Sequence, residues 1–419
     1  MPASYRTLLL ASLAAYAIGA AVVLQLYAPG PWPLDMVNHA VGRDFVNVWV
    51  AGRLVLEGQT AVLFDAEAYQ AALARLVHPA LAPHIWSYPP TSLLIAAPFG
   101  LLAYGWALAL WTVAGLAAFI AVGRIGLDAQ PARIVTALLL VAPATFTNII
   151  CGQDGFLTAA LLAGGFRLLN TRPVVAGLLR GLLSYKPHLG LIVAPALMAL
   201  GAWRTVAVAA ITAFVLAAAS GLAFGFEPWR LFVGVTLHKQ TAMLEAFQGF
   251  FMRMLVSPYA GLRHLGLSHN LAMVAQAGLS VLAIAAVVVL LRGARNREDV
   301  LAIVAAAAFV VSPYTLTYDL PVLALVIARY AARHPHWRRR ESYLLGFAWA
   351  IPMLTIPLLL TGIALPALAL LLLFAMLCAD IWRRSAAGAD ATNLWPATPV
   401  ASQAINATWR RLSRSSSEL

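Results

Sequence analysis

Apolar stretches separated by short polar connections fill most of the 419-residue chain. Several stretches are shorter than the roughly 20 residues that a complete bilayer crossing requires, so their ends must include polar neighbours or belong to broken helices that line a cavity. The pattern predicts an all-α polytopic membrane protein with a bundle of about twelve transmembrane helices. The stretches are 7–27, 91–123, 134–147, 155–169, 173–184, 189–203, 205–225, 271–292, 299–312, 319–333, 341–360 and 363–382.

The stretch 91–123 is long enough for three arrangements, and charge favours one of them. It could hold one tilted crossing, an interfacial helix followed by one crossing, or two tight crossings. If it crosses once, every arginine-rich connection lies on the side of the N-terminus, which the positive-inside rule identifies as the cytoplasm. Two crossings would break this agreement, so we expect a single one. The connections carry Arg124, Arg133, Arg167, Arg172, Arg204, the run Arg292 to Arg297, the cluster Arg329 to Arg340, Arg383 and Arg384.

The opposite side of the membrane receives the segments rich in His, Tyr, Asn, Gln, Asp and Lys. Residues 28–90 form a long first external loop in which Val62 to Leu76 has the spacing of an amphipathic helix that lies along the surface. The run Phe45 to Leu56 is interpreted as a helix that orients Asp44 rather than as the start of a second crossing. The other segments on this side are 148–154, 184–188, 226–270 and 313–319.

The ends of the chain differ in character. The stretch 7–27 is interpreted as a retained first helix, because it is longer than a typical signal segment and no small-residue cleavage site stands out. From about 385 the chain is rich in Ala, Thr and Ser, which predicts a disordered cytoplasmic tail at 385–419. The membrane domain is therefore expected to span 1–384.

Composition supports this class and excludes several others. Hydrophobic residues make up 62% of the chain, charged residues 11%, and the mean hydropathy is +0.83, which is more apolar surface than a soluble core can bury. The net charge of +12 is attributed to cytoplasmic loops and not to nucleic-acid binding, because the arginines lie at segment ends. Cys151 and Cys378 predict neither a disulfide framework nor a thiolate metal site. No HExxH, P-loop or GxGxxG motif occurs, so a zinc protease, an ATPase and a nucleotide-binding domain are excluded.

Asp44 is the first candidate for chemistry. It could simply cap the helix expected to begin near Phe45, which is a common role for an Asp in this position. Arg43 adjoins it, Phe45 and Trp49 offer aromatic surface, and the other external turns carry similar polar groups, which favours a catalytic acid or base.

Two further candidates are polar residues next to apolar stretches. Tyr88, in Trp86-Ser-Tyr88-Pro89-Pro90, either anchors the chain at the membrane interface or contacts substrate. Gln153 lies between two short stretches, in a turn that is either a hydrophilic hairpin with Asp154 as an N-cap or a turn below the membrane surface that faces a cavity. In the second case Gln153 could bind sugar hydroxyls.

A cationic cluster follows at 180–188. Arg180 and Ser184 share a helix face, Tyr185 and Lys186 follow, and Pro187 interrupts the helix. Charge at membrane depth is expensive and marks function by default. Lys186, with Arg180 or His188, could hold a lipid phosphate; alternatively, Lys186 extends to the interface.

The last candidates lie in the external turn at 313–319 and in the loop at 226–270. Tyr318 and Asp319 follow a proline-broken turn, and Asp319 could be an N-cap, a partner of Lys186 or Arg180, or a second acid. His238 and Lys239 could meet phosphate or sugar, or remain solvated.

Taken in order, these short motifs resemble glycosyltransferase family 87, the polyprenyl-phosphate-mannose-dependent mannosyltransferases of the GT-C superfamily. The resemblance covers about residues 1 to 382. In the family pattern Asn usually precedes the Gly-Gln pair, where this chain has Cys151, and Asn148 is a candidate to substitute for it. The motifs are Asp44-Phe45 with Trp49 and Gly58, Tyr88-Pro89-Pro90, Gly152-Gln153, Lys186-Pro187, and Ser312-Pro313-Tyr314 with Tyr318-Asp319.

The resemblance implies a GT-C fold whose active site faces away from the cytoplasm beneath the first long external loop. An Asp in that loop serves as general base in the family and corresponds by position to Asp44, with Asp319 as the alternative. The implied reaction is inverting transfer of a hexose, of mannose in the first place, from a polyprenyl-phosphate donor to a lipid or glycan acceptor. Lys186, with Arg180 or His188, would stabilise the departing phosphate, without a cofactor or an obligatory metal. Tyr88, Gln153, Tyr185, Tyr318, Asp319 and His238 are the expected substrate-binding residues.

The expected location is the inner membrane of a bacterium, with both termini cytoplasmic and the active site facing the periplasm. The competing hypothesis is a transporter or flippase of a lipid-linked substrate that uses the same charges within the membrane. A transporter more often shows an internal repeat, and none is visible here. A membrane-assembly factor is a third, weaker interpretation.

Overall fold

The computed structural model describes residues 1–293, 297–360 and 364–386. These residues fold almost entirely into helices, and the β pairing within these ranges is limited to three isolated bridges. The expected all-α class is therefore confirmed. Residues 385 and 386 still belong to the last helix, and the rest of the predicted tail lies outside the described residues.

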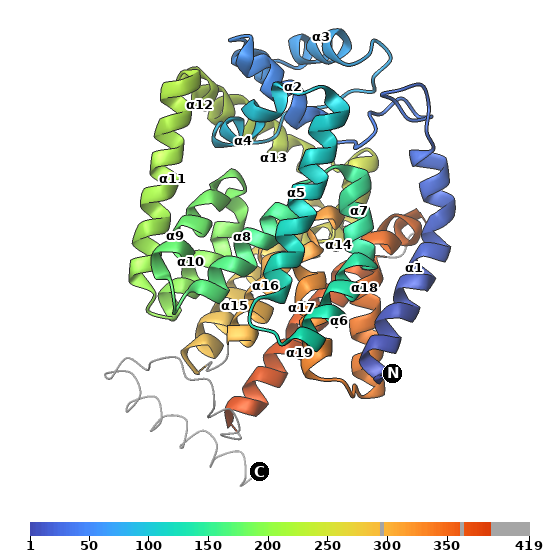
Figure 1. Cartoon of the computed structure of the whole chain (residues 1–419), viewed down its shortest axis with the longest axis vertical. Coiled ribbons are helices and arrows are strands. Elements are labelled where there is room, and N and C mark those ends of the chain that lie inside the picture. Colours follow the sequence, from blue (N-terminus) through green and yellow to red (C-terminus); the bar gives the residue numbers. More distant parts are fainter. Residues whose placement is uncertain (294–296, 361–363, 387–419) are drawn as a thin grey trace.

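Six of the described helices are long and apolar enough to cross a membrane. Figure 1 shows most of them running along the long axis of the molecule. A seventh crossing results if α6 (Ala129–Leu140) and α7 (Pro143–Cys151), which meet at a bend of 51°, count as one broken span. The six are α1 (Ala3–Tyr27), α5 (Tyr104–Arg124), α11 (Trp203–Phe224), α15 (His269–Gly293), α18 (Arg339–Leu360) and α19 (Leu365–Ala386).

The remaining apolar stretches form shorter helices in the interior. Each has at most 15 residues and thus spans about 22 Å or less, whereas the hydrocarbon core measures about 30 Å. In α16 every residue from 299 to 311 is buried, because a helix that is apolar on all sides packs against protein. Length and composition thus identify six or seven spans, and the figure of about twelve remains a prediction. The short helices are α8 (Gly155–Leu168), α9 (Pro173–Leu182), α10 (Gly190–Ala199), α16 (Arg297–Val311) and α17 (Pro321–Arg333).

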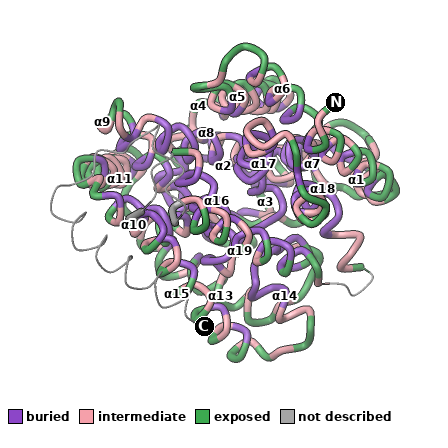
Figure 2. The backbone as a smooth tube through the Cα atoms, turned by 90° about the horizontal axis from the view of Figure 1, so that it is seen from below, coloured by how far each residue is buried: buried purple, intermediate pink, exposed green. Residues whose placement is uncertain are grey.

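Burial follows the same division between interior and periphery. Seen along the bundle, α8, α16 and α17 lie in the buried centre, while α1 and α11 present exposed positions outward (Figure 2). The exposed side chains of α11 include Phe214 and Leu222, which are 74% and 80% exposed. Such residues suit contact with lipid tails, so the hydrophobic periphery is expected of a membrane protein.

The stretch 91–123 folds as a short apolar helix followed by one helix that is long and apolar enough to cross a membrane. Helix α4 (Thr91–Gly100) ends at a break, and only α5 beyond it meets the criteria for a span. Helix α4 packs tightly on α2 (Phe45–Leu56): a Cβ on Gly52 would lie 2.4 Å from Ala96 O. Trp49 of α2 also donates from Nε1 to Leu102 O, at 2.9 Å, within the break. These contacts fix the helix that follows Asp44.

Residues 28–90 and 226–246 carry helices that lie toward the end of the bundle opposite the N-terminus (Figure 1). The predicted helix Phe45–Leu56 is confirmed as α2. The predicted amphipathic run Val62–Leu76 is two elements, because Asp65 breaks it and accepts a hydrogen bond from Ala68 N at 2.8 Å as the N-cap of the second. The elements of this layer, besides α2 and α4, are η1 (Thr60–Phe64), α3 (Ala66–Leu76), α12 (Glu227–Leu231), the π-helical turn η4 (Phe232–Thr236) and α13 (Leu237–Ala246). The chain then continues through η5 (Phe250–Met254) to α14 (Pro258–His264), which lies nearer the middle of the molecule.

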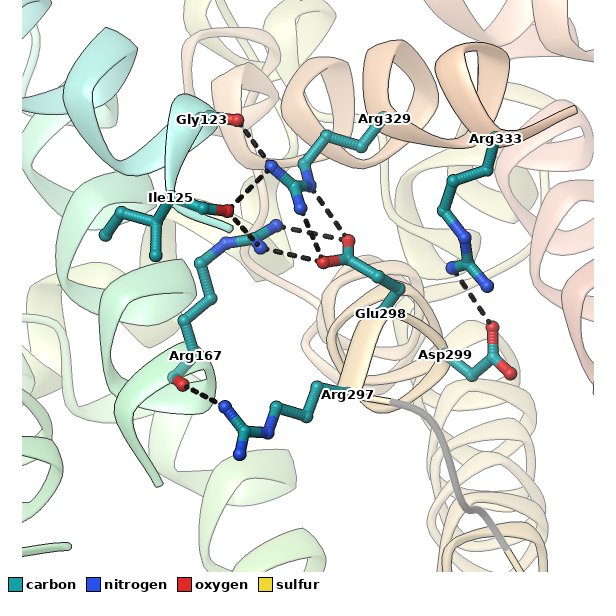
Figure 3. Close-up of polar contacts among 8 residues, drawn as sticks. All are labelled: Gly123, Ile125, Arg167, Arg297, Glu298, Asp299, Arg329 and Arg333. Atoms are coloured by element: carbon teal, nitrogen blue, oxygen red, sulfur yellow. Dashed lines mark hydrogen bonds and ion pairs between the residues drawn. The ribbon is translucent and has the colours of Figure 1, made fainter. Parts of the chain in front are cut away.

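An ion-pair network links several helices at the end of the bundle where the N-terminus of the chain lies (Figure 3). Glu298, at the start of α16, accepts hydrogen bonds of 2.7 Å from both Arg167 of α8 and Arg329 of α17. Arg329 also donates to Gly123 O, at 2.7 Å, at the end of α5. The neighbouring Asp299 pairs with Arg384 of α19, at 2.8 Å. Five helices are thus tied together at this end.

The arginine-rich connections gather at this end, as the charge pattern requires. Ser4 N donates to Pro335 O at 3.2 Å, which places the N-terminus beside the cluster Arg329 to Arg340. Figure 1 shows α19 ending at the same end of the molecule. These connections thus lie near one end of the described bundle, and their place on one side of a membrane stays a prediction.

Candidate active site

Three turns from distant parts of the chain meet in the interior, away from the arginine-rich end. They lie at 148–155 between α7 and α8, at 183–189 between α9 and α10, and at 312–320 between α16 and α17. Gly155 touches the third turn so closely that a Cβ there would lie 2.2 Å from Tyr318 O. Only a glycine allows this approach. The second turn contains η2 (Leu183–Tyr185) and η3 (Pro187–Leu189), and the third contains η6 (Thr317–Asp319).

Lys186 links the three turns through two carboxylates. Its Nζ lies 2.5 Å from Asp154 Oδ1 and 2.5 Å from Asp319 Oδ1, and all three side chains are buried. Asp319 Oδ2 also accepts from Leu316 N at 3.2 Å. Of the roles considered for Asp319, partner of Lys186 is therefore the observed one. Because a lysine ammonium has three donors, one N–H remains for another ligand.

Asp154 is a site residue that the sequence suggested only as a helix cap. It occupies the N-cap position of α8, but its side chain makes no capping hydrogen bond and reaches Lys186 instead. An Asp that gives up a cap to form a buried ion pair is unusual, because both charges lose hydration. The only sequence signal was its place directly after Gly152-Gln153 in a turn between two short apolar stretches.

Asp44 also occupies an N-cap position without capping. It precedes α2, yet no side-chain cap bond forms; its Oδ2 accepts from Gln153 Nε2 at 2.6 Å. Its backbone N–H donates to Cys151 O at 3.0 Å, which joins the first loop to the turn at 148–155. Among the residues the structure describes, Oδ1 has no hydrogen bond. Burial raises the pKa of the Asp44 carboxyl, and the hydrogen bond from Gln153 opposes this rise.

Gln153 is held from two sides. Tyr88 OH donates to Gln153 Oε1 at 3.1 Å, and Asn148 Nδ2 donates to Gln153 O at 3.0 Å. Gly152 has a φ of +58°, and a Cβ there would lie 2.0 Å from Gly42 O. The amide of Gln153 is therefore fixed with its N–H groups toward Asp44, and Tyr88, Gln153 and Asp44 lie in one hydrogen-bonded row. Substrate binding by Tyr88 and Gln153 stays a prediction.

The other aromatic candidates, Tyr318 and Tyr185, are both buried but have different surroundings. Tyr318 is 6% exposed, and the charges of Asp44 and Asp319 both act on its hydroxyl. Tyr185 is buried and shares a hydrogen bond of 2.7 Å with Thr158 Oγ1 of α8, so its hydroxyl stabilises the wall between α8 and η2.

Arg180 is a buried cation that has no counter-charge among the residues the structure describes. It is 6% exposed, its guanidinium lies 3.8 Å over the Phe166 ring, and within the described ranges none of its three nitrogens has a hydrogen-bond partner. Ser184 Oγ, one helical turn further on, is buried and unpartnered as well. An uncompensated buried charge is strongly destabilising, which points to a role in binding an anion.

The two histidine candidates differ. His188 is half-buried, and the charges of Asp319 and Lys186 act on it. His238 is exposed on α13 and makes no hydrogen bond or ion pair with any described residue, so the structure does not bring it to the site. Its neighbour Gln240 instead donates to Ser87 O at 2.8 Å.

One half-buried aromatic contact was not predicted from the sequence. Trp111, in the middle of α5, donates from Nε1 to Gly152 O at 3.1 Å. A tryptophan within a long apolar stretch carries no local signal of such a contact. In the described part of the chain, no three His, Cys, Asp or Glu side chains are grouped so that they could hold a metal ion.

Comparison with known proteins gives one match. The family model described as Glycosyltransferase family 87 matches residues 86–313, which is more than half of the chain. No curated protein and no solved structure gives a significant match.

Proposed function

The chain belongs to glycosyltransferase family 87, and from this premise we propose that it moves a hexose, mannose in the first place, from a polyprenyl-phosphate donor to a hydroxyl of a lipid or glycan acceptor. Its membrane-spanning helices suit a donor with a long lipid chain. The donor, the sugar and the stereochemical course are parts of the proposal.

The observation that carries the proposal is the hydrogen bond between Asp44 Oδ2 and Gln153 Nε2. A capping aspartate would bind the backbone of its own helix, but Asp44 is turned toward the converging turns. Gln153 holds one oxygen, and Oδ1 stays available for an acceptor hydroxyl. Burial raises the pKa of Asp44 toward the range in which a carboxylate is a useful general base.

In the proposed reaction Asp44 takes the proton of the acceptor hydroxyl while the acceptor oxygen attacks the anomeric carbon. The bond between that carbon and the phosphate oxygen breaks, and the polyprenyl phosphate leaves with both bonding electrons. A single displacement inverts the anomeric centre. Because negative charge grows on the phosphate, cations beside it lower the barrier.

Two cations are available for that phosphate. Lys186 retains one N–H beyond its bonds to Asp154 and Asp319, and Arg180 has no other counter-charge in the described residues. A guanidinium can bind phosphate through two parallel N–H groups. His188 lies next to Lys186 in the chain and is a third candidate.

The orientation follows from the arginine-rich end. If that end faces the cytoplasm, as the positive-inside rule predicts, the site and the layer formed by α2, α3 and α13 face outward. We therefore propose the inner membrane of a bacterium, with a site open to the periplasm. A reporter fused near residue 240 should then be detected on the outside.

The transporter alternative is disfavoured by the ion-pair network. Alternating access requires the bundle to open toward the cytoplasm as well. Glu298 joins α16 to α8 and α17 through side-chain hydrogen bonds of 2.7 Å, and Arg329 joins α17 to α5 through a bond of 2.7 Å to the backbone carbonyl of Gly123. These bonds would have to break in every transport cycle.

The test is the Asp44→Asn variant of the full chain, purified and supplied with radiolabelled polyprenyl-phosphate sugars and a crude lipid acceptor. Loss of general-base catalysis should slow transfer by about 10²- to 10⁴-fold. Asp65→Asn is the matched control, because Asp65 does cap its helix and Asn caps equally well.

Transfer at the wild-type rate by Asp44→Asn would eliminate Asp44 as the base. If Asp319→Asn alone abolished transfer, the base would be Asp319. Absence of transfer by the wild-type protein with every donor, together with uptake of substrate into vesicles, would establish the transporter instead.

A further inference from the structure

Arg43, the residue before Asp44, has a backbone conformation that an arginine rarely adopts. Its φ is +40°, and Gly42 before it has a φ of +82°. The left-handed region is sterically unfavourable for a residue with a Cβ, so other contacts must hold Arg43 there. Strained backbone of this kind persists only where the surroundings fix it, and it is concentrated at functional sites. In this chain the strain lies directly beside the proposed base.

The backbone before Asp44 decides where its carboxylate points. Residues 42–44 lie against the turn at 148–155, where Asp44 N donates to Cys151 O at 3.0 Å. From this position the carboxylate accepts from Gln153 Nε2 and makes no capping bond to α2. An aspartate at an N-cap normally accepts from a backbone N–H two or three residues further on. The unusual direction of Asp44 therefore accompanies the unusual backbone that precedes it.

The side chain of Arg43 is held by the first loop and by the end of α1. Its Nη2 lies 2.9 Å from Asp35 Oδ2 and also donates to Leu26 O. Its Cζ lies 4.2 Å from the centroid of the Tyr27 ring. The last turn of α1 has no basic residue of its own, and the free carbonyl groups at a helix C-terminus favour a cation. We call Arg43, Asp35, Leu26 and Tyr27 the clamp.

Asp35 is fixed as firmly as the arginine that it holds. Its Oδ1 accepts from Val37 N at 3.0 Å and from His39 N at 2.9 Å. Its side chain is 3% exposed, and that of Arg43 is 14% exposed. A planar guanidinium can bond to a carboxylate and a carbonyl and stack on a ring at the same time, which a more flexible cation cannot do. The clamp is therefore suited to hold one backbone conformation at Arg43.

We propose that Arg43 is a positioning residue for Asp44: the clamp keeps the backbone at Arg43 left-handed, and this backbone directs the Asp44 carboxylate to Gln153 instead of to the N-terminus of α2. Without the clamp, Arg43 returns to a negative φ and Asp44 caps α2, as an aspartate in this position ordinarily does. In this role Arg43 contacts neither sugar nor phosphate. That Asp44 is the base rests on the proposed function, whereas the control of its direction by Arg43 does not.

Three substitutions of Arg43 separate the backbone from the charge. Arg43→Ala, Arg43→Asn and Arg43→Gly all remove the guanidinium, but glycine adopts a positive φ freely and asparagine does so more readily than alanine. Arg43→Ala should lower kcat about 100-fold, because a displacement of about 1 Å at the reacting groups has an effect of that size. Arg43→Asn should retain more of the wild-type kcat, and Arg43→Gly the most. The KM values for donor and acceptor should stay within about twofold of wild type, since the clamp does not touch substrate.

Arg53 provides the matched control. It is also an arginine near an aromatic ring, with its Cζ 6.0 Å from the centroid of Trp49, but it lies within the helix α2. Arg53→Ala should keep the wild-type kcat. Arg53→Gly should be no more active than Arg53→Ala and less stable, because glycine is unfavourable inside a helix. Opposite orders of alanine and glycine at Arg43 and Arg53 would assign the effect to the left-handed backbone.

Asp35→Asn opens the clamp without changing Arg43. The asparagine can still accept from Val37 N and His39 N, but it lacks the charge that holds the guanidinium. Asp35→Asn alone should lower kcat at least about tenfold. It should have no further effect in Arg43→Gly, because glycine needs no clamp, and such non-additivity is expected of residues that act as a unit. If Arg43→Ala does not fold, this comparison tests the same point.

The direction of Asp44 can also be observed without any substrate. A cryo-EM structure of Arg43→Ala should show the carboxylate bonded to the first turn of α2 and separated from Gln153, and Arg43→Gly should restore the bond. This readout stands even if the wild-type protein transfers no sugar, a result that would refute the proposed function and not the clamp. The proposal would be overturned by a wild-type kcat in Arg43→Ala, by equal losses in the three variants, or by an intact bond to Gln153 in Arg43→Ala. A raised KM with unchanged kcat would also overturn it, because Arg43 would then bind substrate.

Discussion

Gln153 donates a hydrogen bond of 2.6 Å to Asp44, a residue 109 positions earlier in the chain. The bond stabilises the charged form of the carboxylate and so works against the effect of burial on its pKa. The pH dependence of the reaction is therefore expected to depend on Gln153.

Gln153→Leu should move the acidic limb of the kcat/KM profile to higher pH. Without the amide, the pKa of Asp44 rises further above its usual value, and the base becomes deprotonated only at higher pH. A hydrogen bond to a charged group contributes about 1.5–3 kcal/mol, which corresponds to a shift of about one to two pH units. Tyr88→Phe, which removes only the bond to Gln153 Oε1, should shift the limb less. Identical profiles for Gln153→Leu and wild type would contradict the assignment of Asp44.

Arg180→Met should separate stability from donor binding. Arg180 is a buried cation with no hydrogen bond or counter-charge in the described part of the chain. Its replacement by an apolar side chain of similar length should leave the thermal unfolding midpoint unchanged or raise it. The donor KM should rise at least tenfold, because the phosphate loses a charged contact. Arg167→Met is the matched control, since Arg167 is also buried on a short helix but is paired with Glu298. The control should lower the midpoint without changing the donor KM; the same behaviour in Arg180→Met would make Arg180 a structural residue.

Glu298→Gln should destabilise the protein without altering the chemistry. The substitution removes the negative charge that lies between the buried side chains of Arg167 and Arg329. The free energy of unfolding should fall by about 3 kcal/mol, the lower end of the range for a broken buried pair, because the Glu298 side chain is 20% exposed. Thermal unfolding in detergent, followed by the transfer rate per folded molecule, measures both effects. Glu57→Gln, in an exposed pair with Arg75, should change neither. A lower rate per folded molecule in Glu298→Gln would show that this end of the bundle takes part in turnover.

Gly152→Ala should be far more harmful than Gly126→Ala. Both glycines have positive φ, so alanine costs roughly 1–2 kcal/mol of backbone strain at either position. Gly126 has open space around its Cβ position, whereas at Gly152 the Cβ would lie 2.0 Å from Gly42 O. The turn would have to move away from the first loop, taking Gln153 from Asp44. Unfolding midpoints and transfer rates of the two variants test this, and equal losses would mean that the close approach is unimportant.

Properties that depend on local pattern could be predicted from the sequence. Hydropathy identified the apolar stretches, and the positions of the arginines assigned their connections to one end, because both signals are carried by residues close together in the chain. The helix Phe45–Leu56 was predicted correctly for the same reason. The polar turns around Gln153, Lys186 and Asp319 stood out because polar residues are costly between apolar stretches.

Which of these turns meet was decided only by the tertiary structure. Lys186 and Asp319 are 133 residues apart, and their contact depends on how the short helices pack, down to the absence of a side chain at Gly155. The same packing left Arg180 without a counter-charge within the described ranges, directed Asp154 away from its helix cap, and left His238 exposed on the outer layer. A residue's chemistry can be read from its type, but its partner is fixed by the arrangement of helices far apart in the chain, and no local pattern encodes that arrangement.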